Sequence, residues 1–147
     1  MSFAKETRFR MTVEMGGETK TFFPTSVEQK ERNLRVCREK GYKVLECSKL
    51  YPFSVEKNGH NFFLIHNVCL NRMYAMESGE LPMNEAEYER LSERLEQMNE
   101  LLALPRPIAW LSFSELEVAR EIATEAILFR QERCVEAGRP ELVPYCA

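Results

Sequence analysis

The sequence predicts an α+β fold: a small antiparallel sheet, formed by an N-terminal hairpin and a third strand, with one helix inserted and three helices following. Two observations carry this prediction. Apolar and polar residues alternate in residues 8–15, as they do in a half-buried strand. From about residue 61 onward, apolar residues instead recur every three or four positions, which is the spacing of amphipathic helices.

The first predicted element is a β-hairpin. Residues 8–15, RFRMTVEM, place their apolar side chains at the odd positions and therefore on one face. Gly16-Gly17 follows and can adopt the positive φ angles of a two-residue hairpin turn. With such a turn, ETKTFF returns as the second strand and Met11 lies opposite Phe22.

A helix and a third strand come next. Thr25 and Ser26 can each cap a helix that runs to about Lys40, and Gly41 suits the left-handed conformation that ends helices. The apolar stripe of this helix is thin, so we expect it on the surface, against one face of the sheet; the stripe consists of Val27, Leu34 and Cys37. YKVLECSKLY then predicts the third strand, whose register the sequence does not define.

The stretch VEKNGHNFFLIHNVCLNRM, residues 55–73, is compatible with two structures. Asn58-Gly59 is a frequent hairpin turn, whereas the apolar residues from 55 to 76 have helical spacing. The run FFLI breaks strict alternation, and the periodic segment is too long for one strand. These features favour a helix from about Asn61 to the stop at Ser78-Gly79, and they leave Val55–His60 open between hairpin and helix.

Two further helices are predicted after residue 80. Asn84, with Glu87 as its capping-box partner, starts the first of them, and Pro105 to Pro107 ends it.

The last helix is predicted to begin at Ser114, with Glu117 completing the capping box. Phe113 and Val118 would form a hydrophobic staple across that start. Gly138 stops the helix. We find no linker or repeat, so we predict a single domain over residues 1–147, with a strand-and-helix part at 1–52 and a helical part at 53–147.

The composition is that of an ordinary globular protein, with 44% apolar and 29% charged residues. No apolar run has the length of a membrane span, and the first residues lack an apolar signal-peptide stretch, so we expect no membrane association and a cytoplasmic location. All 23 acidic residues are Glu, which disfavours sites that depend on Asp, such as calcium loops or Ser-His-Asp triads. Five widely spaced cysteines indicate reduced, mostly packed thiols: Cys37, Cys47, Cys69, Cys134 and Cys146.

His60, His66 and Cys69 are the residues with the chemistry of a metal or thiol-enzyme site. In a helix, His66 and Cys69 lie one turn apart, whereas His60 is nearly on the opposite face. Only one tight ligand pair exists, and no local motif selects one cysteine as a nucleophile. We therefore interpret His66 and Cys69 as packing residues and predict a non-enzymatic protein without a cofactor or a resident metal.

The first third of the chain is basic and suggests nucleic-acid binding as an alternative function. Residues 1–50 carry 11 Lys and Arg against 7 Glu, whereas the rest of the chain is acidic. The cations that could contact phosphates lie on the polar face of the hairpin and along the first helix: Arg8, Arg10, Lys30, Arg32, Arg35 and Arg38. Interleaved Glu residues and the total charge of −3 oppose this interpretation.

The helix after Asn84 offers the opposite electrostatic feature, a face rich in Glu. Such a face can contact a basic protein surface, for example one that normally holds nucleic acid. Its charged residues are Glu85, Glu87, Glu89, Arg90, Glu93, Arg94 and Glu96.

Three stretches, LYPFSVEKNGHNF, NRMYAMESGE and ELVPYC, resemble uncharacterised small proteins carried by bacterial conjugative elements and phages. The resemblance covers about Leu50 to Cys146 and implies a bacterial accessory protein, with no activity or site attached. Our prediction is a non-enzymatic, protein-binding accessory or regulatory module of a mobile element. The most specific version of this prediction is an inhibitor of a host defence nuclease. A protein partner is thus expected.

Overall fold

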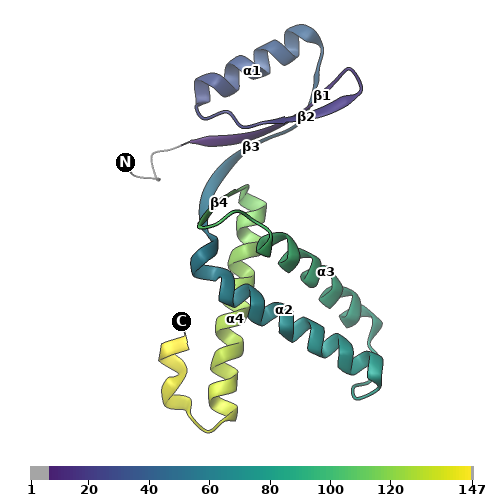
Figure 1. Cartoon of the computed structure of the whole chain (residues 1–147), viewed down its shortest axis with the longest axis vertical. Coiled ribbons are helices and arrows are strands. Elements are labelled where there is room, and N and C mark those ends of the chain that lie inside the picture. The colour runs from purple at the N-terminus through teal and green to yellow at the C-terminus, as the bar shows by residue number, and fades with distance from the viewer. Residues whose placement is uncertain (1–6, 147) are drawn as a thin grey trace. The chain divides into compact units, whose positions relative to one another are not determined.

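The structure is a computed structural model that describes residues 7–146, although not the side chains of residues 145 and 146. The elements are, in chain order, β1 (Arg8–Met15), β2 (Glu18–Phe22), α1 (Val27–Lys40), β3 (Lys43–Ser54), α2 (Val55–Ser78), α3 (Glu85–Leu102), β4 (Ile108–Leu111), α4 (Phe113–Glu136) and the 3-10 helix η2 (Pro140–Cys146) (Figure 1). The strands form one sheet in the order β2-β1-β3-β4. The predicted α+β fold is confirmed, and β4 is an addition to it.

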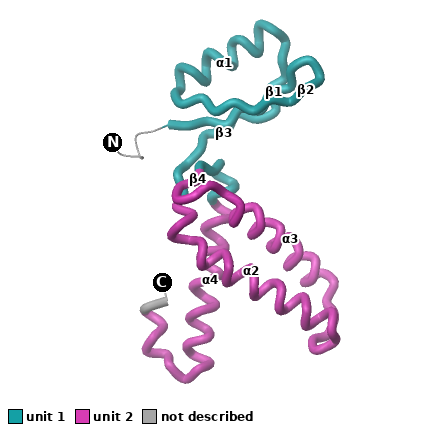
Figure 2. The backbone as a smooth tube through the Cα atoms, in the orientation of Figure 1, with its two compact units in different colours: residues 1–53, 110–116 teal, residues 54–109, 117–147 magenta. Residues whose placement is uncertain are grey.

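The chain forms two compact units, which Figure 2 shows in different colours. Unit 1 comprises residues 1–53 and 110–116, and unit 2 comprises residues 54–109 and 117–147. Unit 1 has 11 Lys and Arg against 8 Glu, whereas unit 2 has 9 against 15. The two units therefore carry net charges of opposite sign, +3 and −6.

The N-terminal hairpin has the predicted register, with Met11 opposite Phe22. Gly16 and Gly17 form the turn with φ angles of 57° and 86°, which residues with a Cβ rarely adopt. The apolar face of β1 is buried beneath α1, which lies over the sheet in Figure 1. The centre of this small core is Met11, Val13 and Cys37, with Met15, Leu34, Tyr42 and Val44 packed around it.

Helix α1 begins and ends at the predicted residues. The Ser26 hydroxyl oxygen accepts a hydrogen bond of 3.1 Å from the backbone N–H of Gln29, and Gly41 ends the helix with φ 73°. Cys37 is buried as expected. Val27, which the sequence placed on the buried stripe, is instead 54% exposed, because it stands in the first turn at the margin of the sheet.

Strand β3 pairs with β1 in a register that contains a β-bulge. Thr12 lies opposite Glu46, and the next residue, Val13, lies opposite Val44. Leu45 is therefore an extra residue without a partner on β1, and it is largely exposed.

Helix α2 starts directly after β3, so the hairpin alternative for Val55–His60 is wrong. The Ser54 hydroxyl oxygen caps the helix by accepting from the backbone N–H of Lys57 at 3.2 Å. Gly59 is buried, and a Cβ atom there would lie 3.0 Å from the guanidinium of Arg106. The absence of a side chain at Gly59 thus permits the segment with Arg106 to approach closely. The dipeptide Asn58-Gly59 had suggested a turn instead.

Helices α2 and α3 pack side by side as an antiparallel pair within unit 2 (Figure 1). Asn84 caps α3 as predicted, because its side-chain oxygen accepts from the N–H of Glu87 at 3.1 Å. The Glu87 carboxylate does not complete a capping box. It accepts instead from Arg72 of α2, which ties the two helices together.

The start of α4 lies one residue before the predicted cap. Ser112 and Glu115 form the capping box: the Ser112 N–H donates to the Glu115 carboxylate at 2.9 Å, and the Glu115 N–H donates to the Ser112 hydroxyl at 3.4 Å. The box predicted from Ser114 and Glu117 is therefore wrong. The sequence offers two overlapping capping-box patterns here, and β4 delivers the chain to the first of them.

The predicted staple between Phe113 and Val118 is wrong for the same reason. Phe113 is 57% exposed in the first helical turn. Leu111 and Leu116 now hold the two staple positions, and both are buried. The end of α4 agrees with the prediction, with Gly138 in the left-handed region. In the tail that follows, Leu142 and Val143 are half-buried, and the side chain of Tyr145 lies outside the described residues.

Candidate functional site

Helix α4 carries apolar residues on more than one side. Its buried stripe within unit 2 consists of Ala119, Ile122 and Ala126, none of which is exposed. Further apolar residues, among them Leu128 and Phe129, lie outside this stripe, and Leu128 is 53% exposed. A helix of a small protein normally leaves one polar side to water, so this second apolar side requires an explanation.

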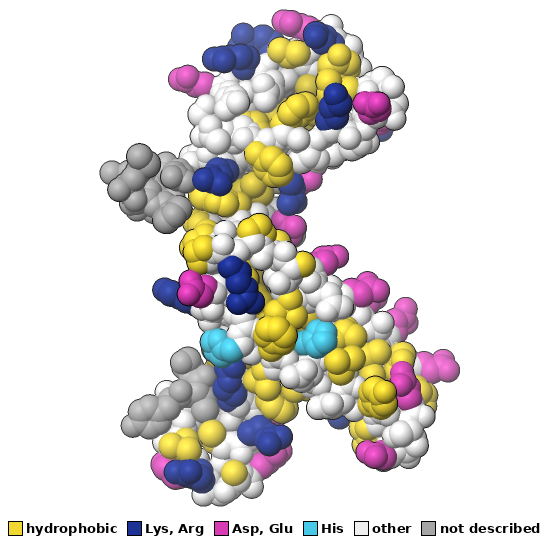
Figure 3. All heavy atoms as spheres, viewed as in Figure 1, with side chains coloured by type: hydrophobic (Ala, Val, Ile, Leu, Met, Phe, Trp, Pro, Cys, Tyr) yellow, Lys and Arg dark blue, Asp and Glu magenta, His cyan; other side chains and the backbone are white. Residues whose placement is uncertain are grey.

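The second side of α4 faces a groove that α2 and α3 complete. The groove has a volume of about 660 Å³, which is within the range of ligand-binding clefts. The space-filling view shows it as the hollow between the lower half of α4 and the α2–α3 pair (Figure 3). Its apolar lining comes from all three helices and comprises Ile65, Val68, Cys69, Leu91, Val118, Leu128 and Phe129.

The rim of the groove is acidic. Two arginines, Arg90 and Arg94, line it on α3. Five carboxylates stand against them, namely Glu87, Glu93, Glu121, Glu125 and Glu132. The lining therefore carries a net charge of −3 around an apolar floor, and unit 2 as a whole adds to the negative potential.

Arg94 connects α3 to α4 across this groove. Its guanidinium donates to the Glu125 carboxylate at 2.8 Å and to the Glu121 carboxylate, and it also donates to the side-chain oxygen of Gln97 at 2.7 Å. The Arg94 side chain is 18% exposed, whereas Glu125 is 40% and Glu121 is 60% exposed. Arg94 is thus a shielded cation shared by two carboxylates, and it holds two walls of the groove together.

Burial shifts the pKa of two groups in the groove. Burial raises the pKa of the Glu125 carboxyl above its ordinary value, although the neighbouring Arg94 acts in the opposite direction. Burial also raises the pKa of the Cys69 thiol, which keeps it protonated at neutral pH. Cys69 therefore serves the groove as an apolar floor residue and lacks the features of an activated nucleophile.

The three candidate ligands of the sequence do not converge. His60 is exposed, and Cys69 is buried. His66 is half-buried, with its Nε2 atom 3.1 Å from the side-chain oxygen of Asn99 on α3. Among residues 7–146, the structure brings no three His, Cys or Glu side chains together as a group able to hold a metal ion.

The six cations of the nucleic-acid hypothesis do not share one surface. Because β1 alternates, Arg8 and Arg10 lie on the face of the sheet opposite to α1, together with Ser48, which pairs with Arg10. The other four lie on α1. Of these, Lys30 stands 4.9 Å above the ring of Phe9, and three are exposed: Arg32, Arg35 and Arg38.

Arg8 and Arg10 also have partners within unit 1. The Arg8 guanidinium lies 4.3 Å from the ring centre of Trp110. Arg10 donates to the Glu46 carboxylate at 2.8 Å and to the Glu115 carboxylate at 3.1 Å. These hydrogen bonds lower the pKa of Glu46 and raise that of Arg10. Both arginines therefore have a structural role in joining the sheet to the segment that contains β4.

The acidic helix face that the sequence indicated is only partly the face of the groove. Glu87, Arg90, Glu93 and Arg94 line the groove, whereas Glu85, Glu89 and Glu96 do not. Sequence reasoning missed the α4 wall. Its signal was present: apolar residues and Glu share one helical side, at positions 118, 121, 125, 128, 129 and 132, beside the separate apolar stripe that contains Ile122.

Comparisons with known proteins found no match: no family model, no curated protein and no solved structure is detectably similar to the chain. Within residues 7–146, none of the helices combines the length and the apolar character needed to cross a bilayer.

Proposed function

We propose that the protein is a protein-binding module, and that the groove formed by α2, α3 and α4 binds a basic amphipathic helix of its partner. The single observation that supports this most is the pairing of an apolar floor with an acidic rim in a groove of about 660 Å³. Helix-in-groove recognition uses these two elements, since the apolar side of a helix supplies affinity and flanking charges supply orientation.

The charge of the groove determines which partner it fits. Lys or Arg residues beside the apolar stripe of a partner helix would meet Glu93, Glu121 and Glu132 at the rim. A polyanion such as nucleic acid is disfavoured at this place by the same net charge. The proposal thus retains the expectation of a partner with a basic surface, of which nucleases and nucleic-acid-binding proteins are one class. Accessory function in a mobile element remains the further, narrower prediction.

Leu128 and Val135 provide a matched pair for the test. Both are apolar residues of α4, with exposed fractions of 53% and 58%, but only Leu128 lines the groove. Full burial of a leucine side chain contributes about 1.5–3 kcal/mol, and Leu128 is already half buried, so about half of this, roughly a fourfold to tenfold change in affinity, remains for binding. We therefore expect Leu128→Ser to weaken partner binding at least fourfold and Val135→Ser to leave it unchanged.

The experiment has two arms. In the first, tagged wild type, Leu128→Ser and Val135→Ser are used to capture proteins from the native host, each with and without nuclease treatment. In the second, the dissociation constant of a blocked leucine-lysine amphipathic helix is measured against the same variants at two salt concentrations. Equal binding by wild type and Leu128→Ser in both arms would refute the proposal. Capture that nuclease treatment abolishes would favour the alternative of nucleic-acid binding through the basic unit.

A further inference from the structure

Unit 1 has an open strand edge that the groove of unit 2 does not involve. β2 is the outermost strand in the order β2-β1-β3-β4, and all five of its residues are exposed. Because Met15 pairs with Glu18 across a two-residue turn, alternate residues of β2 bond to β1. The alternation leaves Thr19 and Thr21 with backbone N–H and C=O groups directed away from the sheet, where another strand can pair with them.

An apolar cavity opens beside this edge. Helix α1 packs on β1 and β3, and the core beneath it contains no residue of β2 among those described. The remaining space between α1 and the hairpin has a volume of about 160 Å³ and is lined by Met11, Val13, Met15, Phe22, Asn33, Val36, Cys37 and Tyr42. A cavity of about 150 Å³ is large enough for a benzene ring, so a Leu or Phe side chain fits here.

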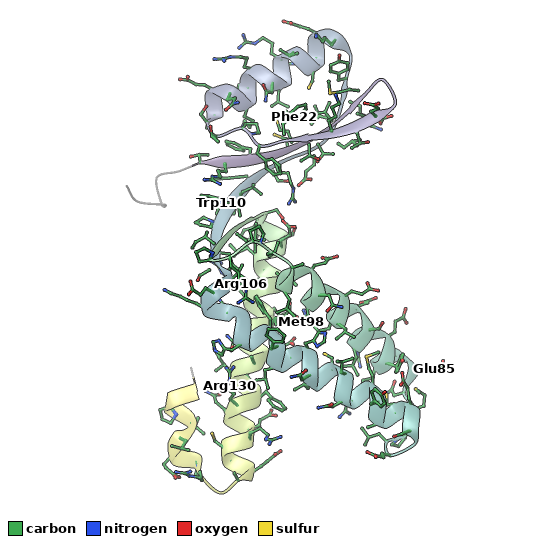
Figure 4. All side chains as sticks on the ribbon, in the orientation of Figure 1. Phe22, Glu85, Met98, Arg106, Trp110 and Arg130 are labelled. Carbon is green, nitrogen blue, oxygen red and sulfur yellow. The ribbon has the colours of Figure 1, made fainter. Side chains whose placement is uncertain are left out.

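Phe22 and Val36 mark the opening of the cavity. They come from β2 and α1, with exposed fractions of 39% and 40%, and Figure 4 shows Phe22 between α1 and the sheet. The neighbouring Phe23 is 60% exposed. A free strand edge and an apolar pocket beside it are the two features of a β-addition site. At such a site, main-chain hydrogen bonds supply affinity and the pocket selects one side chain.

We propose that unit 1 binds an extended segment of a partner protein, which pairs with the edge of β2 and inserts one apolar side chain between α1 and the hairpin. Side chains of a paired strand alternate between the two faces of a sheet. Those on the face of Phe22 and Lys20 lie on the same side as Met11 and Val13 and therefore meet the cavity. The partner thus needs one Leu or Phe within a stretch of β-forming residues.

Charge favours an acidic partner segment. Unit 1 has a net charge of +3, which is the basis of this preference. Lys20 stands in the middle of β2 on the cavity side, next to Glu18 on the same face, and Lys40 ends α1 one turn after Val36, next to Glu39. Glu or Asp residues beside the apolar anchor would lie near these cations. A second copy of β2 paired about Lys20 would place two lysines directly opposite each other, which disfavours self-association in that register.

The test is a selection of random displayed 12-residue peptides on the full-length protein, with three variants as comparisons. Thr21→Pro removes an outward N–H without removing a hydrogen bond to β1, and proline is tolerated on a strand edge. Thr21→Val keeps that N–H and is its matched control. Val36→Asp places a charge at the opening of the cavity. We expect the selected peptides to share an apolar residue with acidic neighbours, and to bind Thr21→Pro and Val36→Asp at least tenfold more weakly than wild type or Thr21→Val.

Three results would overturn the proposal. One is a selection that enriches no peptide above the empty support. Another is binding that Thr21→Pro and Val36→Asp do not weaken, with amide NMR spectra showing that both variants are folded. The third is binding lost on Leu128→Ser, which would place the peptide in the groove of unit 2. Leu128→Ser also distinguishes the two proposals. If the groove of unit 2 binds no helix, the proposal for the β2 edge of unit 1 is not affected.

Discussion

Replacing Arg94 with methionine tests how the groove is held together. Methionine keeps the apolar stem of the side chain and removes the cation that Glu121 and Glu125 share. A hydrogen bond to a charged group contributes about 1.5–3 kcal/mol, and an exposed ion pair contributes about 1 kcal/mol or less. Because the two carboxylates are 60% and 40% exposed, we discount the sum to about 2 kcal/mol of unfolding free energy.

The loss should depend on pH with a defined sign. Burial raises the pKa of Glu125, and removing Arg94 raises it further. Arg94 attracts Glu125 only while the carboxylate is ionised, so the effect of Arg94→Met is larger at neutral pH than at acidic pH. It declines as the pH falls through the pKa of folded Glu125, which lies above the ordinary value of 4.5.

Thermal unfolding followed by circular dichroism at pH 7 and pH 4 measures this effect. A loss of about 2 kcal/mol corresponds to a fall in Tm of about 4–8 °C for a chain of this size. Arg90→Met is the matched control, because Arg90 lines the same groove on α3 but is exposed. A loss for Arg94→Met no larger than that of the control, or one of equal size at both pH values, would refute the role assigned to Arg94.

Two further predictions concern stability. Ile122→Ala should lower the unfolding free energy by about 2–5 kcal/mol, because the side chain is fully buried in the interior of unit 2; a urea titration that gives less than 1 kcal/mol would show that the site is loosely packed. Ser112→Ala should lower the unfolding free energy by about 0.5–2 kcal/mol, because the cap of α4 is lost, and Ser114→Ala should lower it by less. A larger loss for Ser114→Ala in the same titration would show that Ser114 is the cap, as the sequence suggested.

The local elements were predictable where one signal dominated. Gly41 and Gly79 both take the left-handed φ that ends a helix, and the glycine pair of the first hairpin fixed its register. The segment around Gly59 was ambiguous, because the same residue suits a turn and a close contact between segments. In the helix, Gly59 lies against Arg106, a residue distant in sequence, and no local pattern contains that contact.

The candidate site was harder to predict than the fold, since a groove arises from the relation of several helices. Glu93 and Arg94 could be assigned to an acidic helix face from their sequence alone. Their position opposite Glu125 depends on how α3 and α4 pack against each other, which no local sequence pattern contains. The basic residues failed as one surface because strand alternation places Arg10 on the face away from α1.

The two sides of α4 also restrict how this helix can change in length. Each residue of an α-helix advances the direction of the side chain by about 100°. One residue inserted after Ala123 would therefore keep Ile122 in the interior of unit 2 but rotate Ala126 out of it and turn Glu125 away from Arg94. Substitutions on the groove side of α4 change only the lining of the groove, whereas single insertions or deletions between residues 119 and 129 disrupt the groove and the interior of unit 2 together. Natural or designed diversity in this helix should thus consist of replacements at constant length.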